Sequence, residues 1–142
     1  MKIGLFTDSL QDLSFSEAVN WVADQGIEAI ELGTGNFSNA VHCNLEALLK
    51  DGSGRSKLLS ELKARDLTLS ALNCNGNLLD PDPSRRSKAQ QTFYNTVELA
   101  NLLGVDTIVT MSGCPGEPGG TFPNWITCNW QREFPELLAR QW

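Results

Sequence analysis

The feature that most limits how this chain folds is a fourfold alternation of short apolar segments with longer amphipathic ones. A strand that pairs in parallel with its successor needs a connection of about a dozen residues or more, and that connection is usually a helix. The alternation therefore predicts the order β-α-β-α-β-α-β and an α/β fold on a parallel sheet. The predicted strands are residues 2–7, 27–33, 67–75 and 105–110.

The first connection has the pattern of a helix that covers one side of a core. Ser14 is followed three residues later by Glu17, which is the signature of a capping box, and Gly26 stands where a glycine often ends a helix. Apolar residues recur at the spacing of one helical face. That predicted face is Phe15, Ala18, Val19, Val22 and Ala23.

The two later connections are also predicted to be helical. One begins near Asn44, is interrupted by residues 51–54 and continues to Leu62. The other runs from about residue 84 to residue 103, and Gly104 is its predicted stop. Asp80 and Asp82 come just before it and are interpreted as part of the helix start rather than as catalytic groups. Its predicted apolar face is Phe93, Val97, Ala100 and Leu103, and its basic cluster, Arg85, Arg86 and Lys88, is interpreted as a solvated helix start.

Composition narrows the classes of function. The chain has 142 residues, 41% of them hydrophobic, which is enough for one domain with a core. A net charge of −6 argues against nucleic acid and anionic membranes as partners, because phosphate binding needs a basic face. No apolar run approaches the roughly 18 residues of a membrane span, and the first residues are too polar for a signal peptide. A cytoplasmic location is the expectation.

Polar or small residues follow all four predicted strands. In parallel α/β folds the carboxyl ends of the strands form the functional edge, whether the sheet is open or closed. A site is therefore expected where these ends meet. The residues concerned are Thr7, Asp8 and Ser9; Glu31, Gly33 and Thr34; Asn73, Cys74, Asn75 and Asn77; and the loop MSGCPGEPGG at 111–120.

The loop at 111–120 fits no standard phosphate-binding motif. A P-loop needs a lysine after its glycines and a helix directly behind it, and Pro115 and Pro118 oppose a helix. The backbone amides of this glycine-rich loop could still bind an anion as a nest. A nucleophilic Cys114 would need His42, the only histidine, as its base, and the alternative is a small residue packed in a loop.

The cysteines do not suggest a disulfide or zinc framework. None of them stands in CxxC spacing, so reduced thiols are expected in a cytosolic chain. His42 lies beside a cysteine, but adjacent residues point in different directions, and a zinc site would have to gather ligands from separate loops. The four cysteines are Cys43, Cys74, Cys114 and Cys128.

Several segments in order resemble a known family. They are KIGLFTDSL, GIEAIELGTG, HCNLEALL, LSALNCNGNLLDPD, TVELANLLGVDTIVTMSGCPG and PNWITCNW. Together they resemble the sugar phosphate isomerase/epimerase group of the xylose-isomerase-like TIM barrels, whose relatives include inosose dehydratases, tagatose epimerases and endonuclease IV. The resemblance implies a (β/α)8 barrel with its site at the carboxyl ends of the strands. It also implies a divalent metal (Mn, Mg, Co or Zn) and proton transfer next to a carbonyl.

The resemblance gives the strand-end residues a role in binding a sugar or polyol. A purely structural role is the alternative for these residues. Glu31 would then be an exposed carboxylate at a strand end, and His42 a hydrogen-bonded structural histidine. Asn73 and Asn75 would stabilise local turns. Trp125, with Trp130, would form an apolar wall against the sugar or a lid on the barrel rim. The predicted substrate-binding residues are Glu31, His42, Asn73, Asn75, Ser112, Cys114 and Trp125, and no residue is assigned to catalysis.

The chain departs from the family pattern in its length. It ends at Trp142 after about four strands, whereas a TIM barrel needs roughly 250 residues. The expected fold is therefore the first half of a barrel, residues 1–142, with the metal ligands beyond Trp142. A non-catalytic half-barrel that forms a homodimer or binds small polyols is the first alternative. An endonuclease-IV-like DNA repair enzyme is the second, disfavoured by the acidic charge and the single histidine.

Overall fold

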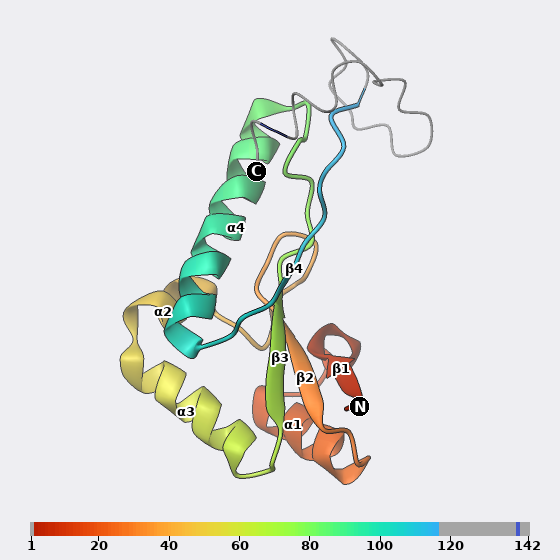
Figure 1. Cartoon of the computed structure of the whole chain (residues 1–142), viewed down its shortest axis with the longest axis vertical. Helices are drawn as coiled ribbons and strands as arrows, with labels where there is room; N and C mark the ends of the chain where they lie inside the picture. Colours follow the sequence, from red (N-terminus) through yellow and green to blue (C-terminus); the bar gives the residue numbers. More distant parts are fainter. Residues whose placement is uncertain (1, 117–138, 140–142) are drawn as a thin grey trace.

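The computed structural model describes residues 2–116 and 139. Four strands form one sheet in the order β1-β2-β3-β4, and every neighbouring pair is parallel (Figure 1). The predicted alternation of parallel strands with helices is therefore confirmed. The strands are β1 (Gly4–Phe6), β2 (Ala29–Gly33), β3 (Thr68–Asn73) and β4 (Ile108–Val109).

Helices connect the strands and cover one face of the sheet. The core lies between them, where Ile30, Leu32 and Leu72 of the strands pack with apolar residues of the helices. Successive side chains of a strand point to opposite faces. Glu31 therefore points away from this core, toward the other face of the sheet. The helical elements are η1 (Thr7–Leu10, a 3-10 helix), α1 (Phe15–Asp24), α2 (Leu45–Lys50), α3 (Gly52–Lys63) and α4 (Pro83–Leu103).

The first and last strands are shorter than their apolar segments predict. Pairing of β1 with β2 ends at Phe6 and Glu31, because the chain turns into η1 at Thr7. At the other end of the sheet, the N–H of Val105 donates to the carbonyl of Ala100 and completes the end of α4. Val105 therefore belongs to the end of the helix rather than to the strand, and only Ile108–Val109 pair with β3.

The predicted interruption between the two helical parts is confirmed, but it is shorter than residues 51–54, since only Asp51 breaks the helix. Its backbone is extended, its N–H donates to the carbonyl of Ala47, and its side chain accepts the N–H of Ser53. Asp51 thus ends α2 and caps α3, so the two glycines that follow already lie in α3. An acidic N-cap compensates for the low helix propensity of glycine here.

The predicted apolar face of α4 is partly wrong. Ala100 and Leu103 are buried as expected, but Val97 is 42% exposed. The buried stripe passes instead through Thr96 and Leu99. The hydroxyl of Thr96 donates to the carbonyl of Thr92 and is also hydrogen-bonded to the hydroxyl of Thr34. Because these bonds satisfy the hydroxyl, a polar residue can occupy the buried face of α4.

The capping box at Ser14 is confirmed, and so is the apolar face of α1. The Ser14 hydroxyl accepts the N–H of Glu17, and the Glu17 carboxylate accepts the N–H of Ser14. At the start of α4, Asp82 is the N-cap and Pro83 the first helical residue, as the helix-start interpretation requires. Gly104 ends α4 in a left-handed conformation, with φ of 69°.

We expect Ser14→Ala to lower the free energy of unfolding by about 1 kcal/mol, because it removes the cap of α1. The hydrogen bonds from Ser14 lower the pKa of Glu17, so this stabilisation is present above the ordinary pKa of 4.5 and is lost as the pH falls through the lowered value. Urea unfolding at pH 7 and at acid pH measures both effects. Ser60→Ala, an exposed helical serine, is the control and should cost nothing; an equal loss there would contradict the capping argument.

Among the described residues, no helix is long and apolar enough to cross a membrane. Cys43, Cys74 and Cys114 are buried. Cys128 lies outside the described residues.

Candidate functional site

Two neighbouring strands bring a carboxylate and an amide together at their carboxyl ends. Asn73, the last residue of β3, donates from Nδ2 to Oε1 of Glu31 in β2 over 2.5 Å. Oδ1 of Asn73 accepts the N–H of Asn75 at 3.0 Å, so both ends of the amide are fixed. Asn73 is 4% exposed, whereas Glu31 is only partly buried. The predicted residues Glu31, Asn73 and Asn75 therefore lie together at the sheet edge.

A second polar pair crosses the edge above Gly33. The hydroxyl of Ser38, in the loop after β2, donates to Oδ1 of Asp8 in η1 over 2.8 Å. A Cβ added to Gly33 would lie 2.2 Å from the Ser38 hydroxyl and 2.6 Å from the Asp8 carboxylate. Gly33 is thus required for the two loops to meet beside Glu31. A carboxylate from η1 and a hydroxyl from the loop after β2 therefore join the same edge.

The loop after β4 is held by one asparagine side chain. Oδ1 of Asn77 accepts the N–H of Cys114 at 2.6 Å, and Nδ2 of Asn77 donates to the carbonyl of Cys114 at 2.8 Å. The amide therefore bonds Cys114 as a neighbouring backbone would. Gly113 completes the contact, because it has φ of +95° and a Cβ there would lie 2.8 Å from the backbone nitrogen of Leu79.

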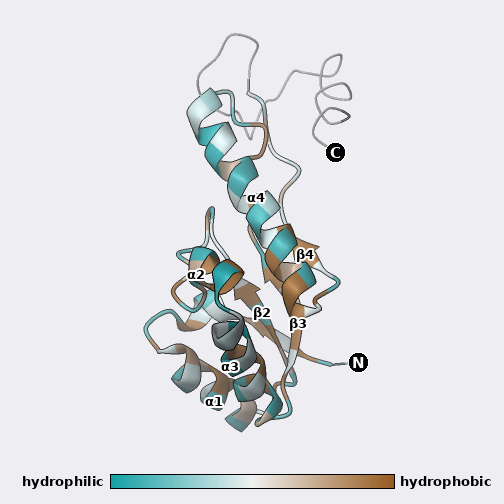
Figure 2. Ribbon diagram, turned by 90° about the vertical axis from the view of Figure 1, so that its left-hand side faces the viewer, coloured by the Kyte–Doolittle hydropathy of each residue, from teal (hydrophilic) through white to brown (hydrophobic). Residues whose placement is uncertain are grey.

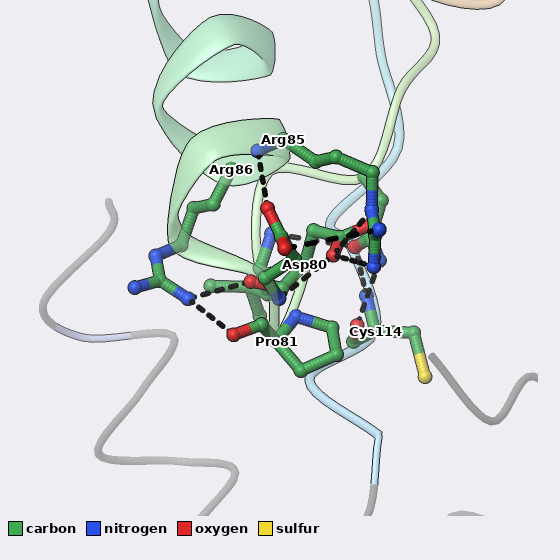
Figure 3. Close-up of polar contacts among 8 residues, drawn as sticks. Asp80, Pro81, Arg85, Arg86 and Cys114 are labelled. Carbon is green, nitrogen blue, oxygen red and sulfur yellow. Dashed lines mark hydrogen bonds and ion pairs between the residues drawn. The ribbon is translucent and has the colours of Figure 1, made fainter. Parts of the chain in front are cut away.

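A buried carboxylate supports this loop from the side of α4 (Figure 3). Asp80 is 7% exposed and forms an ion pair with Arg85, with 3.0 Å between Oδ1 and Nη2. Arg86 donates to the backbone carbonyl of Asp80 at 2.6 Å and reaches the carbonyl of Pro81. The basic cluster therefore differs from a simple solvated face: Arg85 and Arg86 tie the 77–82 turn to α4.

His42 lies apart from the strand ends. Its Nε2 bonds the carbonyl of Leu13 at 2.8 Å, and its ring lies 6.3 Å from the ring of Phe15. His42 is 9% exposed, and its Nδ1 has no partner among the described residues. Neither ring nitrogen bonds the thiol of Cys114, so the structure does not assemble the cysteine–histidine pair that a nucleophile would need.

The remaining predicted site residues differ in their exposure to solvent. Ser112 is exposed after β4, while Cys114 is buried with 2% exposure. Trp125 lies outside the described residues. Burial raises the pKa of the Cys43 thiol to about 12 and also raises the pKa of Cys74. These two thiols stay protonated at neutral pH, which makes them poor nucleophiles and poor metal ligands.

The described residues do not fit a metal centre. Within residues 2–116 and 139, no group of three or more His, Cys, Asp and Glu side chains comes close enough to hold an ion. Glu31 has an amide partner, Asp8 a hydroxyl and Asp80 a guanidinium. What this edge can do is orient a polar ligand: carboxylate oxygens accept hydrogen bonds from hydroxyls, and amides both donate and accept.

Two functional features were missed by reasoning from the sequence. Ser38 follows no predicted strand end directly, and only its contact with Asp8 brings it to the edge. Asn77 is among the residues that follow a predicted strand but not among the predicted substrate-binding residues. The spacing between residues 77 and 114 carries no sequence signal for their pairing.

Known proteins resemble this chain in sequence and in fold. The sequence matches the family model described as xylose isomerase-like TIM barrel over residues 19–140. It is 42% identical over 145 residues to the uncharacterized protein YfiH of Bacillus subtilis (strain 168), a match that covers 100% of this chain and 46% of YfiH. A crystal structure of a xylose isomerase domain containing protein from Salmonella typhimurium LT2 gives a TM-score of 0.50 at 14% identity, over 99% of this chain and 46% of that one.

The structural likeness supports the predicted fold, a partial TIM barrel of parallel β-α repeats. The chain spans about half the length of the relatives that it matches.

Proposed function

Because the chain belongs to the xylose isomerase-like TIM barrel family, we propose that it is the N-terminal part of a metal-dependent sugar or sugar-phosphate isomerase or epimerase. The observation that carries the proposal is the Glu31–Asn73 pair at the carboxyl ends of β2 and β3. In TIM barrels this face holds the active site. The metal, when bound, would polarise substrate oxygens and stabilise the charge that develops on them.

The residues of this chain would bind and orient the substrate. Glu31 keeps one carboxylate oxygen bonded to Asn73 and presents a partly buried acceptor to a sugar hydroxyl. Asp8 and Ser38 line the same edge over Gly33. The Asn77–Cys114 contact fixes the loop after β4 to the segment that follows β3. Proton transfer next to a carbonyl would then be assigned to groups outside the described residues.

The proposal is tested with the protein isolated from its source, after its intact mass has been measured. Incubation in D2O with Mn2+ and a panel of ketoses, aldoses and their phosphates should introduce deuterium at the carbon next to the carbonyl, detected by proton NMR. Removal of the metal with EDTA should stop the exchange. No exchange with any sugar of the panel would contradict the proposal.

We expect residues 1–142 alone to show no exchange, because the described residues contain no metal-binding cluster. The same NMR assay with added Mn2+, Mg2+, Co2+ or Zn2+ checks this, and a refolded sample with intact far-UV circular dichroism excludes loss by unfolding. Metal-dependent turnover by the 142-residue chain would show that the ligands lie within it.

In the active protein, Glu31→Gln should lower kcat/KM by about 10- to 100-fold, since a hydrogen bond to a charged group contributes about 1.5–3 kcal/mol. Glutamine preserves the shape and can still accept from Asn73, so the fold should persist. Glu98→Gln, an exposed change on α4, is the matched control. Equal activities of the two variants would remove Glu31 from the substrate site.

Open strand edges favour a second candidate, a half-barrel that self-associates. β1 and β4 lie at the ends of the sheet, and each leaves one edge without a strand partner among the described residues. Two copies related by a twofold axis would supply eight strands. Light scattering separates the candidates: a clean dimer of the 142-residue chain supports self-association, whereas a monomer or an ill-defined aggregate supports a part of a longer barrel.

A further inference from the structure

A polar cleft lies on the helical side of the sheet, away from Glu31. It runs between the loop after β2 and the N-terminal half of α4 and has a volume of about 1020 Å3. Figure 1 shows α4 extending beyond the carboxyl ends of β2 and β3, with the loop after β2 next to it. The size is at the upper end of the range of roughly 300–1,000 Å3 for small-molecule sites. It exceeds what one monosaccharide needs.

The base of the cleft is fixed by three contacts between the loop and α4. The hydroxyls of Thr34 and Thr96 are 2.8 Å apart. Asn36 donates from Nδ2 to the carbonyls of Cys74 at 2.9 Å and Ala89 at 3.3 Å. A Cβ on Gly35 would lie 2.9 Å from a methyl group of Thr92, so the loop backbone touches the helix. Walls fixed in this way reduce the ordering cost of binding.

Amide side chains line both walls. On α4, Gln91 donates from Nε2 to Oδ1 of Asn95 at 2.8 Å, which aligns the two amides along the helix. On the loop, Asn39 donates to Gln11 at 2.8 Å, and Asn44 accepts the N–H of Ala47. A side-chain amide has two N–H donors and two acceptor lone pairs, so each keeps hydrogen-bonding capacity after these bonds. Figure 2 shows that the N-terminal half of α4 is mainly hydrophilic, whereas its C-terminal half carries both hydrophilic and hydrophobic residues.

The charges and the apolar lining determine the class of ligand. Among the described residues, Lys88 and Glu46 are the charged side chains that line the cleft, one of each sign, so this lining favours neither an anion nor a cation. Val41, which is 52% exposed, and Leu45 add apolar surface that suits the C–H faces of a sugar ring. We propose that the cleft binds a neutral, hydroxyl-rich ligand of disaccharide size, at a site separate from the Glu31–Asn73 edge.

Titration of the 15N-labelled chain with maltose, followed by two-dimensional NMR, tests this site without any assay of activity. Side-chain amide signals of Gln91 and Asn95 and the backbone signal of Gly35 should shift together and saturate, with a Kd of about 0.1–10 mM. The double variant Gln91→Ala, Asn95→Ala should weaken binding by at least about tenfold. Asn101→Ala, an exposed amide on the same helix, should leave the Kd unchanged.

Three results would overturn the proposal: no shift up to about 100 mM maltose, shifts confined to Glu31, Asn73 and Asn75, or equal binding by the double variant and the wild type. Helix content by circular dichroism shows that each variant is folded, which is expected because Gln91 is exposed and Asn95 partly so. Since the readout is binding on the helical side, failure here leaves the proposed isomerase function untouched, and failure of the exchange assay leaves this site untouched.

Discussion

Leu72→Ala should lower the free energy of unfolding by about 2–5 kcal/mol, a large share of the roughly 5–15 kcal/mol that stabilises a typical domain. Leu72 is fully buried in β3 and pairs with Ile108 of β4, so it packs where the sheet meets the helices. Truncation removes apolar contacts on the helix-covered face and leaves a cavity that the neighbouring strands cannot fill without shifting the ladder.

Urea unfolding followed by circular dichroism measures the loss. Leu102→Ala is the matched control, because Leu102 lies on α4 and is 40% exposed. That variant should change the stability by no more than about 0.5 kcal/mol, as other surface substitutions do. Equal losses in the two variants would mean that the core does not lie between the sheet and the helices as described.

Periodicity predicted the elements well where one physical cause dominates. The stripe of α1 follows directly from the 3.6-residue period, and its ends carry their own signals in Ser14 and Gly26. The face of α4 was mistaken at Val97, because hydrophobicity alone ranks valine above threonine. Thr96 is buried nonetheless, since Thr34 and the carbonyl of Thr92 satisfy its hydroxyl. Because Thr34 lies in a distant segment of the sequence, no local pattern predicts that Thr96 is buried.

The candidate site also contains residues that the sequence could predict and residues that it could not. Glu31, Asn73 and Asn75 could be predicted together, because parallel strands bring their carboxyl ends to one edge. His42 follows from no such rule, since its loop is long enough to carry it to Leu13 and Phe15 instead. The loop at 111–116 was correctly placed beyond the last strand, but its attachment depends on Asn77, which lies 37 residues earlier in the chain.

Asn77→Ala should cost about 2–4 kcal/mol of unfolding free energy, because it removes the hydrogen bonds to the N–H and the carbonyl of Cys114, both in buried surroundings. The loop after β4 should also loosen, so the Cys114 thiol, now 2% exposed, should react faster with a maleimide. Urea unfolding and peptide mapping of the labelled protein measure the two effects. The exposed Asn101→Ala should change neither.

Asn77→Asp distinguishes the hydrogen bonds from simple packing, since it preserves the shape of the side chain. The carboxylate can still accept the N–H of Cys114, but it has no proton for the carbonyl of Cys114 and lies near Oδ2 of Asp80, which is 3.5 Å from Nδ2 of Asn77 in the native chain. It should therefore destabilise the fold at neutral pH. Protonation restores a donor and removes the repulsion, so its deficit relative to the wild type should shrink as the pH falls. A deficit independent of pH would mean that Asn77 acts through its volume alone, and the loop after β4 would then owe its position to Gly113 and its neighbours.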